Sequence, residues 1–219
     1  MRTKVRPSKK RLRFLIASGP TQEPLDPVRF ISNNSTGVMG KHLYQAARAR
    51  GHAVTWVECP KKARTALELQ KKLSSLIGKN DVLVMAAAVC DVRPKAFSGT
   101  KIKKERLRAI PLVKNPDILA SLKKKKKKDQ VFIGFGLESS GLFKNGFNKV
   151  ISKGLDLITL QKVTKNSDPF GEKTVSAFLL DRGKNLKKFA VVSKRTLSKI
   201  LVREAEKMYR QKLAFQSQK

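Results

Sequence analysis

The segment from Ser18 to Gly40 has the composition of a loop that approaches phosphate groups closely. It reads SGPTQEPLDPVRFISNNSTGVMG, and at about twenty residues it is far longer than ordinary connections between elements. Gly37 and Gly40 lie where a helix is expected to begin, and free N–H groups at a helix N-terminus favour anions. With Gly19 and Ser35 they form our candidate phosphate or substrate loop, although a GxxG spacing alone is a weak motif.

The same segment carries two side chains suited to a reacting carboxylate. The amide of Asn33 can donate to an oxygen on which negative charge develops. Arg29 offers a planar fork that fits a carboxylate or phosphate. The alternative for Asn33 and Asn34 is ordinary turn chemistry, because Asn tolerates left-handed conformations.

Two later segments add further polar candidates. Asp91 follows an apolar strand, where its carboxylate could accept hydrogen bonds from a sugar hydroxyl or a base amine, or could simply cap a helix. Ala88 precedes it and is a candidate for the substrate loop. Lys101 opens the stretch KIKK, where an ammonium could neutralise phosphate charge; a solvated lysine is the alternative.

The third group of candidates suits a nucleotide. A short helix opens with the segment Pro116, Asp117, Ile118 and Leu119, which places proline in its favoured first turn and leaves N–H groups free. Phe135 ends a strand where its ring could stack on a base, although core packing is commoner. Lys149 and Lys153 share one helix face, so we expect an anion between them, or a solvated surface.

The elements that must position these residues alternate between strand and helix. We expect strands at 12–17, 53–58, 81–89, 131–136 and 155–160, helices at 37–51, 64–77, from 116, 142–153 and 194–213, and an antiparallel hairpin from 174–181 and 186–192. Continuous hydrophobicity in the strands implies helices on both faces. The fold class is therefore α/β, a Rossmann-like, doubly wound, mostly parallel sheet with a C-terminal antiparallel hairpin, whose ligands bind beyond the carboxyl ends of the strands.

Composition limits the classes of partner. The chain has 49 Lys+Arg against 16 Asp+Glu, a net charge of +33. The seven cations of residues 1–13 and the six of residues 123–128 leave +20 on the rest, so the whole surface is basic and non-specific polyanion contact is expected. We interpret 1–11 as a basic flexible tail, 12–213 as a single domain, 214–219 as a second tail, and the lysine run 123–128 as an exposed connection.

Other classes are disfavoured. No apolar run approaches the roughly 20 residues that span a bilayer, and residues 1–13 lack the apolar core of a secretory signal. Cys59 and Cys90 form no CxxC pair, and no histidine cluster accompanies them, so we expect no disulfide framework, no structural metal site and a reducing cytoplasm.

Five segments in order, DPVRFISNNSTGVMG, AAAVCDVRPK, KIKK, KNPDIL and KGLDLI, resemble those of phosphopantothenate-cysteine ligase, the CoaB family. The resemblance covers roughly 13–198 and is strongest to the bacterial form that is usually fused to a flavin-dependent decarboxylase, a half that this sequence does not contain. It implies a two-step reaction through an acyl-nucleotidyl intermediate, with CTP rather than ATP, Mg²⁺, and a homodimer that completes the phosphopantothenate site.

The resemblance also implies residue roles. Asn33 matches the position that handles the acyl intermediate, and Lys101 matches a lysine that contacts the nucleotide and serves cysteine transfer. Arg29 is carried over as a third catalytic residue. The positions matching nucleotide contacts are Asp91, Lys101, Pro116, Asp117, Ile118, Leu119, Phe135, Lys149 and Lys153.

The chain departs from the family pattern at several positions, and two alternatives are considered. Val38 replaces a lysine, Leu137 lies in GFGLES where GFAAET is usual, Gln161-Lys162 replaces Asn-Asp, and Thr174 replaces an Asn. A degenerate relative acting as a basic nucleic-acid-binding protein is the alternative, although aromatics are only 6% and no nucleic-acid motif is present. A dinucleotide-dependent oxidoreductase would need a GxGxxG, which is absent.

Overall fold

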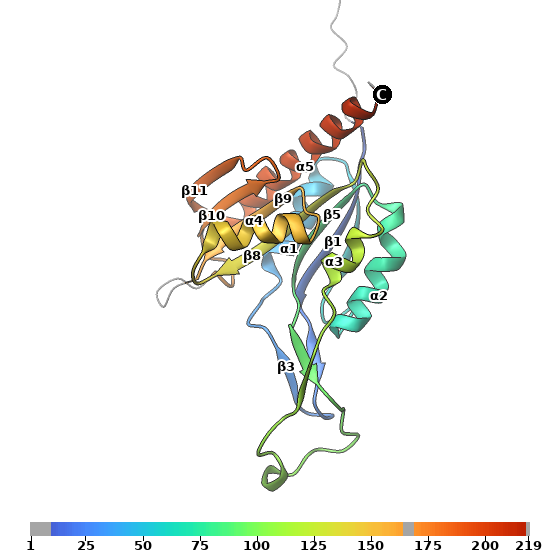
Figure 1. Ribbon diagram of the computed structural model, residues 1–219, viewed down its shortest axis with the longest axis vertical. Coiled ribbons are helices and arrows are strands. Elements are labelled where there is room, and N and C mark those ends of the chain that lie inside the picture. The colour runs from blue at the N-terminus through green and yellow to red at the C-terminus, as the bar shows by residue number, and fades with distance from the viewer. Residues whose placement is uncertain (1–9, 164–168, 218–219) are drawn as a thin grey trace, which may run out of the picture.

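A seven-stranded sheet forms the centre of the molecule. In the computed structural model, which describes residues 10–163 and 169–217, the strand order is β11-β10-β9-β8-β5-β1-β4 (Figure 1). The strands from β4 to β9 pair in parallel, whereas β10 pairs antiparallel with both β9 and β11. Their bounds are β1 Arg13–Pro20, β4 Ala53–Glu58, β5 Val82–Ala88, β8 Val131–Glu138, β9 Leu157–Lys162, β10 Val175–Asp181 and β11 Leu186–Val192.

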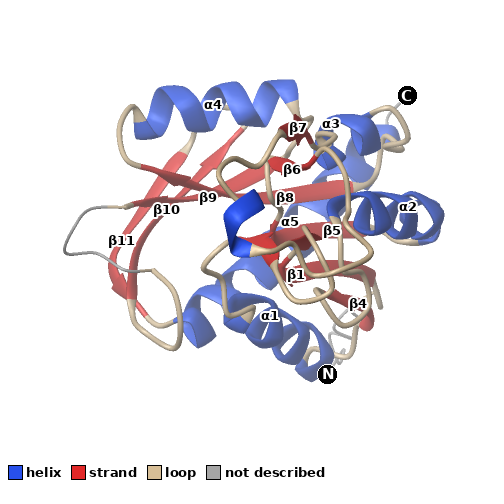
Figure 2. Cartoon of the chain, turned by 90° about the horizontal axis from the view of Figure 1, so that it is seen from below, coloured by secondary structure: helices blue, strands red, loops and turns tan. Residues whose placement is uncertain are grey.

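Helices cover both faces of this sheet. Side chains of α1 and α5 pack on one face and those of α2, α3 and α4 on the other, as Figure 2 shows for α1 and α4. Successive residues of each strand point to opposite faces, so Phe14 and Ile16 join the first core and Leu15 and Ala17 the second. The helices are α1 Val38–Ala49, α2 Ala66–Leu76, α3 Ile118–Lys123, α4 Leu142–Ser152 and α5 Lys194–Gln216, with 3₁₀ turns η1 Ile77–Lys79 and η2 Lys104–Arg106.

The expected fold class is confirmed, including the antiparallel hairpin at the end of the sheet. The helix expected from 116 begins at Ile118, because Asp117 is its N-cap and accepts a hydrogen bond from the Ala120 N–H. The last helix continues to Gln216, three residues beyond its expected end. Within the described residues no helix combines the length and the apolarity needed to cross a membrane.

An arm extends from the sheet at the lower end of Figure 1, and it was not expected from the sequence. The loop after β1 folds into β2 (Gln22–Pro24) and β3 (Phe30–Ser32), and the loop after β5 into β6 (Val92–Pro94) and β7 (Leu112–Lys114). We call residues 22–32 and 92–114 the arm. Its two ribbons meet because β2 contacts β6.

A buried carboxylate links the two halves of the arm. Asp26, whose side chain is fully buried, accepts hydrogen bonds from the Arg29 guanidinium and from the backbone N–H groups of Val28 and Ile102. Burial opposes ionisation of Asp26, but these donors outweigh it and hold the pKa of the carboxyl well below its usual range. The anion therefore fixes residue 102 against the first ribbon.

The lysine run 123–128 is more than an exposed connection, which corrects the expectation from sequence. The side chain of Lys126 is only 11% exposed, and its ammonium lies 2.6 Å from an Asp156 oxygen. Lys212 of α5 approaches the other Asp156 oxygen at 2.7 Å. Lys123 donates to the last carbonyls of α4. The Asp156 carboxylate can be buried only because these cations compensate its charge. The lysine run therefore connects the end of α3 to α4 and to the residue that precedes β9.

Candidate active site

A cleft of about 520 Å³ opens at the carboxyl ends of β1, β5 and β8. This size is usual for small-molecule sites, and this edge is where parallel sheets bind ligands. The lining brings together most of the nucleotide and catalytic residues expected from sequence. They are Asn33, Ala88, Asp91, Pro116, Asp117, Ile118, Leu119, Phe135 and Lys153.

Asn33 joins the loops that follow β1 and β5. Its side-chain amide donates to the Ala88 carbonyl at 3.1 Å while remaining exposed to the cleft. Thr21 strengthens the same junction, because its hydroxyl accepts from the Cys90 N–H at 3.0 Å. An amide donor is therefore held at the mouth of the cleft beside two backbone segments.

The glycines of the first loop permit close packing of backbones. Gly19 has φ +81°, and an added Cβ there would lie 2.2 Å from the Cys59 carbonyl oxygen. At Gly40 an added Cβ would lie 2.0 Å from the Ser18 Cβ. Gly37, with φ +70°, precedes the first residue of α1. These contacts alone account for Gly19 and Gly40, and phosphate binding at this loop stays a prediction.

The start of α3 forms one wall of the cleft. Asp117 caps this short helix and lies 3.5 Å from the Lys153 ammonium at the end of α4. Asn115, just before it, donates from its side chain to the Cys90 carbonyl at 2.9 Å, and its backbone N–H donates to the Asp91 carbonyl. Asp91 is thereby held in the same lining as Asp117, and it is exposed.

Lys149 and Lys153 pair with different carboxylates within the chain, and an anion held between them stays a prediction. The Lys149 ammonium pairs with Glu138 at the end of β8, whereas Lys153 pairs with Asp117. Burial opposes ionisation of Glu138, but hydrogen bonds from Lys149 and Asn145 outweigh it and lower the pKa of the carboxyl. Of the two lysines, Lys153 lines the cleft.

Two of the predicted catalytic residues lie on the arm, outside the cleft lining. The Arg29 Nε and Nη2 groups donate to Asp26, and Nη2 also donates to the Ile102 carbonyl oxygen. Two of the three guanidinium nitrogens are therefore engaged within the chain, and a role of Arg29 in binding substrate stays a prediction. Lys101 is exposed at the neighbouring position. Arg29 therefore holds the segment that carries Lys101.

The cleft lining includes the thiol of Cys90. Burial raises the pKa of the Cys90 thiol, which hydrogen-bonds to the carbonyls of Thr21 and Ile31, so it stays protonated. Among the described residues, no group of three or more His, Cys, Asp or Glu side chains is placed to hold a metal ion.

A second, smaller hollow of about 190 Å³ adjoins the cleft, and Ala88 and Phe135 line both. The departures Val38, Leu137 and Gln161 all lie here, together with Ser35 and Gly37. Thr174 is exposed just before β10 and lies outside both linings. Val38 and Gln161 therefore change the smaller hollow, whereas Leu137 lines the cleft as well.

Several lining residues were missed or left without a role by the sequence reasoning. Phe170 lines both hollows, and Lys194 lines the smaller one. Lys194 is buried and donates to the Pro169 carbonyl at 2.6 Å, which fixes the segment carrying Phe170. Asn115 had a usable signal, its place directly before the Pro116 segment. Lys194 had none, because nothing local predicts burial of a helix-start lysine.

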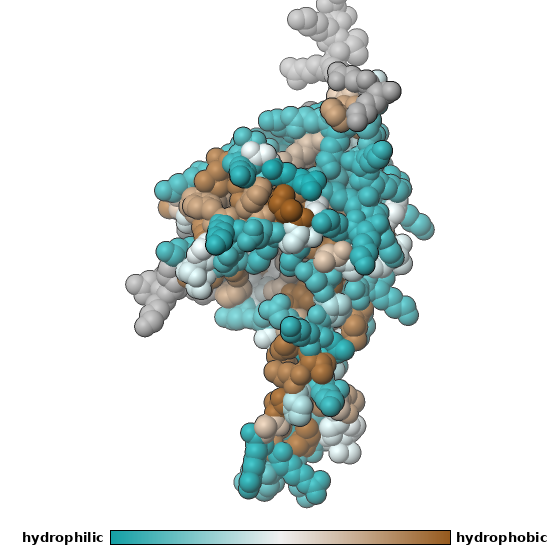
Figure 3. Space-filling view, in the orientation of Figure 1, coloured by the Kyte–Doolittle hydropathy of each residue, from teal (hydrophilic) through white to brown (hydrophobic). Residues whose placement is uncertain are grey.

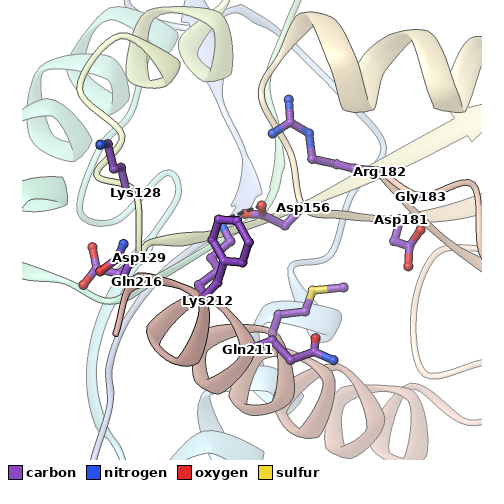
Figure 4. Close-up of a pocket in the computed structure, with 11 residues that line it drawn as sticks. Lys128, Asp129, Asp156, Asp181, Arg182, Gly183, Gln211, Lys212 and Gln216 are labelled. Carbon is purple, nitrogen blue, oxygen red and sulfur yellow. Dashed lines mark ion pairs between the residues drawn. The ribbon is translucent and has the colours of Figure 1, made fainter. Parts of the chain in front are cut away.

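A further hollow lies at the opposite edge of the sheet. It measures about 1020 Å³, is wide open, and is lined by residues at the amino ends of β8 and β9 and along the last turns of α5. Figure 4 shows Asp156 and Lys212 facing each other there. Because Lys126 and Lys212 already engage the Asp156 carboxylate, this hollow offers an internal ion network, and the cleft is the better candidate for chemistry.

Comparisons with known proteins show the family to which the chain belongs. The model of the DNA/pantothenate metabolism flavoprotein C-terminal domain matches residues 9–209. The chain is 36% identical over 205 residues to a protein named cysteine/cysteine sulfinic acid decarboxylase from an unknown prokaryotic organism, covering 88% of this chain and 57% of that protein. It is 32% identical over 217 residues to the coenzyme A biosynthesis bifunctional protein CoaBC of Escherichia coli strain K12, covering 90% and 53%.

Solved structures show the same fold. The C-terminal domain of a CoaBC protein superposes with a TM-score of 0.75 at 24% identity, covering 91% of this chain and 96% of that one. A mutant of Cab2 in complex with phosphopantothenate-cysteine gives 0.74 at 15% identity, covering 94% and 89%. The chain spans just over half the length of the curated relatives, so their names do not transfer to it. The match over 9–209 shows that the chain belongs to the family of the DNA/pantothenate metabolism flavoprotein C-terminal domain.

Proposed function

We propose that the chain is a ligase that joins 4'-phosphopantothenate to L-cysteine at the expense of a nucleoside triphosphate, in cytoplasmic coenzyme A synthesis. The observation that carries this proposal is the cleft, which gathers Asn33 and Asp91 from two loops, Phe135 from β8 and Lys153 from the end of α4. Its volume suits a nucleotide. Family membership and the complex of a similar fold with phosphopantothenate-cysteine support it further.

The nucleotide has a suitable partner at each end of the cleft. The half-buried ring of Phe135 offers a face on which a base can stack. The Asp91 carboxylate can accept from a sugar hydroxyl or a base amine. Lys153 supplies positive charge for the phosphates, although Asp117 must share it. We favour CTP over ATP because the resemblance is strongest to the bacterial form of the family.

The proposed reaction has two steps. A carboxylate oxygen of phosphopantothenate attacks the α-phosphorus of the nucleotide, and the bond to the leaving pyrophosphate breaks. The cysteine amine then attacks the acyl carbon, gives up a proton, and expels the nucleoside monophosphate with the bonding electron pair. The Asn33 amide would donate to the oxygen that gains charge, and Lys101 would neutralise charge during transfer.

The lining also fits Mg²⁺ bound mainly through the substrate. Magnesium in nucleotide sites takes most of its ligands from phosphates and water, with one or two protein carboxylates. Asp91 is the available carboxylate, since Asp117 is engaged with Lys153 and caps α3. When bound, the ion would spread the charge of the triphosphate, while Asp91 would orient its water shell.

We also propose that the active form is a homodimer joined through the arm. Large apolar side chains are exposed there, Val28 at 61%, Phe30 at 46%, Phe97 at 57% and Leu112 at 49%. Figure 3 shows hydrophobic colour along this extension. Exposed apolar patches of this kind mark contact surfaces. A partner at the arm would also bring Lys101 near a second cleft.

Turnover is the direct test of the ligase. The full chain is incubated with 4'-phosphopantothenate, cysteine, Mg²⁺ and either CTP or ATP, and pyrophosphate release and product mass are followed. Release that requires phosphopantothenate, with the condensed product, supports the proposal and identifies the nucleotide. A folded protein that releases no pyrophosphate with either nucleotide would refute it.

Mixing two inactive variants tests the shared site. Asn33→Ala and Lys101→Gln chains are combined under conditions that allow subunit exchange. If Lys101 serves the partner's cleft, half of the sites in mixed dimers are intact, and about a quarter of wild-type activity should return. No recovery, with exchange confirmed by mass, would place Lys101 in its own subunit's site.

A further inference from the structure

A row of four cations runs along the solvent face of α5. Arg195, Lys199, Arg203 and Lys207 recur at intervals of four residues, and all four are exposed. Each interval advances about 6 Å along a helix axis, so the row spans about 18 Å. We call these four residues the α5 row. The helix crosses the face of the sheet that α1 also covers, away from α2 and α3.

The charges of this row are not neutralised within the described residues. None of its four side chains makes an ion pair or side-chain hydrogen bond there. The acids of the same helix are used elsewhere, since Glu204 pairs with Lys187 and Glu206 is buried against Arg50 and His52. The row therefore presents its full charge to solvent.

This arrangement is unfavourable unless an anion lies against it. Like charges four residues apart on a helix repel by a few tenths of a kcal/mol per pair, and the row contains three such pairs. An extended polyanion with closely spaced phosphates removes the repulsion along the whole row. A duplex carries one charge per about 1.7 Å of axis, so several phosphates face 18 Å of helix.

The residues that accompany the α5 row indicate which kind of polyanion it would bind. Between Arg195 and Lys207 the other exposed residue of α5 is Thr196, which has no aromatic ring, and the exposed Phe215 lies about two helical turns beyond the row. Single strands are held by stacking on such rings, whereas a duplex backbone needs only charge. A membrane-binding helix would need large apolar side chains beside its cations. None of the exposed residues of α5 between Arg195 and Lys207 is large and apolar.

We propose that the α5 row binds the phosphate backbone of a nucleic acid duplex without reading its bases. The row lies outside the lining of the cleft and of the smaller hollow. Binding there is independent of the proposed ligase activity, so the two succeed or fail separately.

The test is the salt dependence of binding to a fluorescent 20-base-pair duplex, as DNA and as RNA in separate arms. The row variant carries Arg195→Gln, Lys199→Gln, Arg203→Gln and Lys207→Gln. A matched control removes the same charge from exposed lysines near α2 and α3, on the other side of the molecule, which likewise have no ion-pair partner among described residues. It carries Lys71→Gln, Lys79→Gln, Lys124→Gln and Lys125→Gln.

For B-DNA each phosphate contact contributes about −0.9 to the slope of log K against log salt, so the row variant, which loses four contacts, should flatten the slope by about 3.6. The control should flatten it by less than about 1, and millimolar CTP should leave the affinity of the wild type unchanged. Binding to only one duplex would identify DNA or RNA as the partner.

Three outcomes would overturn the proposal. The control variant could weaken binding as much as the row variant, which would show that only total charge matters. A single strand of equal length could bind as tightly as the duplex. Anionic vesicles of phosphatidylserine and phosphatidylcholine could retain the protein through the row while the duplex does not. Equal melting temperatures for the two variants establish that the differences do not arise from unfolding.

Discussion

The substitution Asn33→Ala distinguishes a catalytic role of the side-chain amide from a structural role. In the structure the Asn33 side chain makes one hydrogen bond, to the Ala88 carbonyl at 3.1 Å, and it remains exposed. Removing one such bond costs about 0.5–1.5 kcal/mol. For a chain of this length that corresponds to a fall in Tm of roughly 1–6 °C. The fold should therefore survive Asn33→Ala.

The effect on turnover should be much larger. If the amide donates to an oxygen that gains charge, its loss should lower kcat by about 10²–10³, equivalent to roughly 2.7–4 kcal/mol. Asn33→Asp keeps the shape but replaces the donor by a carboxylate, which also faces the Ala88 carbonyl. It should therefore be at least as inactive as the alanine variant, while nucleotide affinity falls little.

Asn34 provides the matched control for this assay. It lines the same cleft, and among the described residues its side chain makes no hydrogen bond. Pyrophosphate release with saturating substrates is measured for Asn33→Ala, Asn33→Asp and Asn34→Ala, with Tm recorded for each. Wild-type kcat in Asn33→Ala, or an equal loss in Asn34→Ala, would refute the role assigned to Asn33.

Four further substitutions have expected outcomes. Gly40→Ala should lower Tm, because overpacking against Ser18 costs about 1–3 kcal/mol, and Ser18→Gly in the same chain should restore most of it in a thermal melt. Burial lowers the pKa of Lys126 to about 8 in the folded chain. Between this pH and the ordinary lysine pKa, Lys126 is therefore protonated in the unfolded chain and mostly neutral in the folded one. The free energy of unfolding should rise by up to about 3 kcal/mol between pH 8 and 10.5, and urea titrations of Lys126→Met should not show this rise. Arg29→Gln should speed hydrogen exchange of the arm amides, and unchanged exchange would contradict its holding role. Lys153→Gln should raise the KM for the nucleotide more than it lowers kcat, and steady-state kinetics showing the reverse would move Lys153 from binding to chemistry.

The main sheet and its helices could be predicted because each strand is a continuous apolar run. Residues 82–85 and 131–134 are buried on both faces, and that pattern requires helices on each side. The arm could not be predicted in this way. Its strands have three residues each, and their pairing depends on Asp26 reaching residue 102, a contact between distant segments that leaves no periodic signal.

The residues of the candidate site also differ in how well the sequence predicts them. Motif positions on the backbone edge of the sheet, such as Asp91 and the Pro116 segment, line the cleft as expected, because topology alone places them there. The roles of charged side chains were harder to foresee. Arg29 and Lys149 have carboxylate partners three and eleven residues away, and which cation a carboxylate selects is decided by tertiary packing.

The basic residues that make up the charge excess therefore have several different roles. Lys126 and Lys212 are required by a single buried carboxylate, and replacing either would leave part of that charge uncompensated at a cost to folding. Lys153 belongs to the cleft, and Lys194 fixes the segment beside it. None of these lysines is free to serve a long-range polyanion, so the net charge of +33 overstates what the surface offers. Cations that recur regularly and have no internal partner are the ones whose removal should change binding without changing stability, and among the described helices α5 carries such a row.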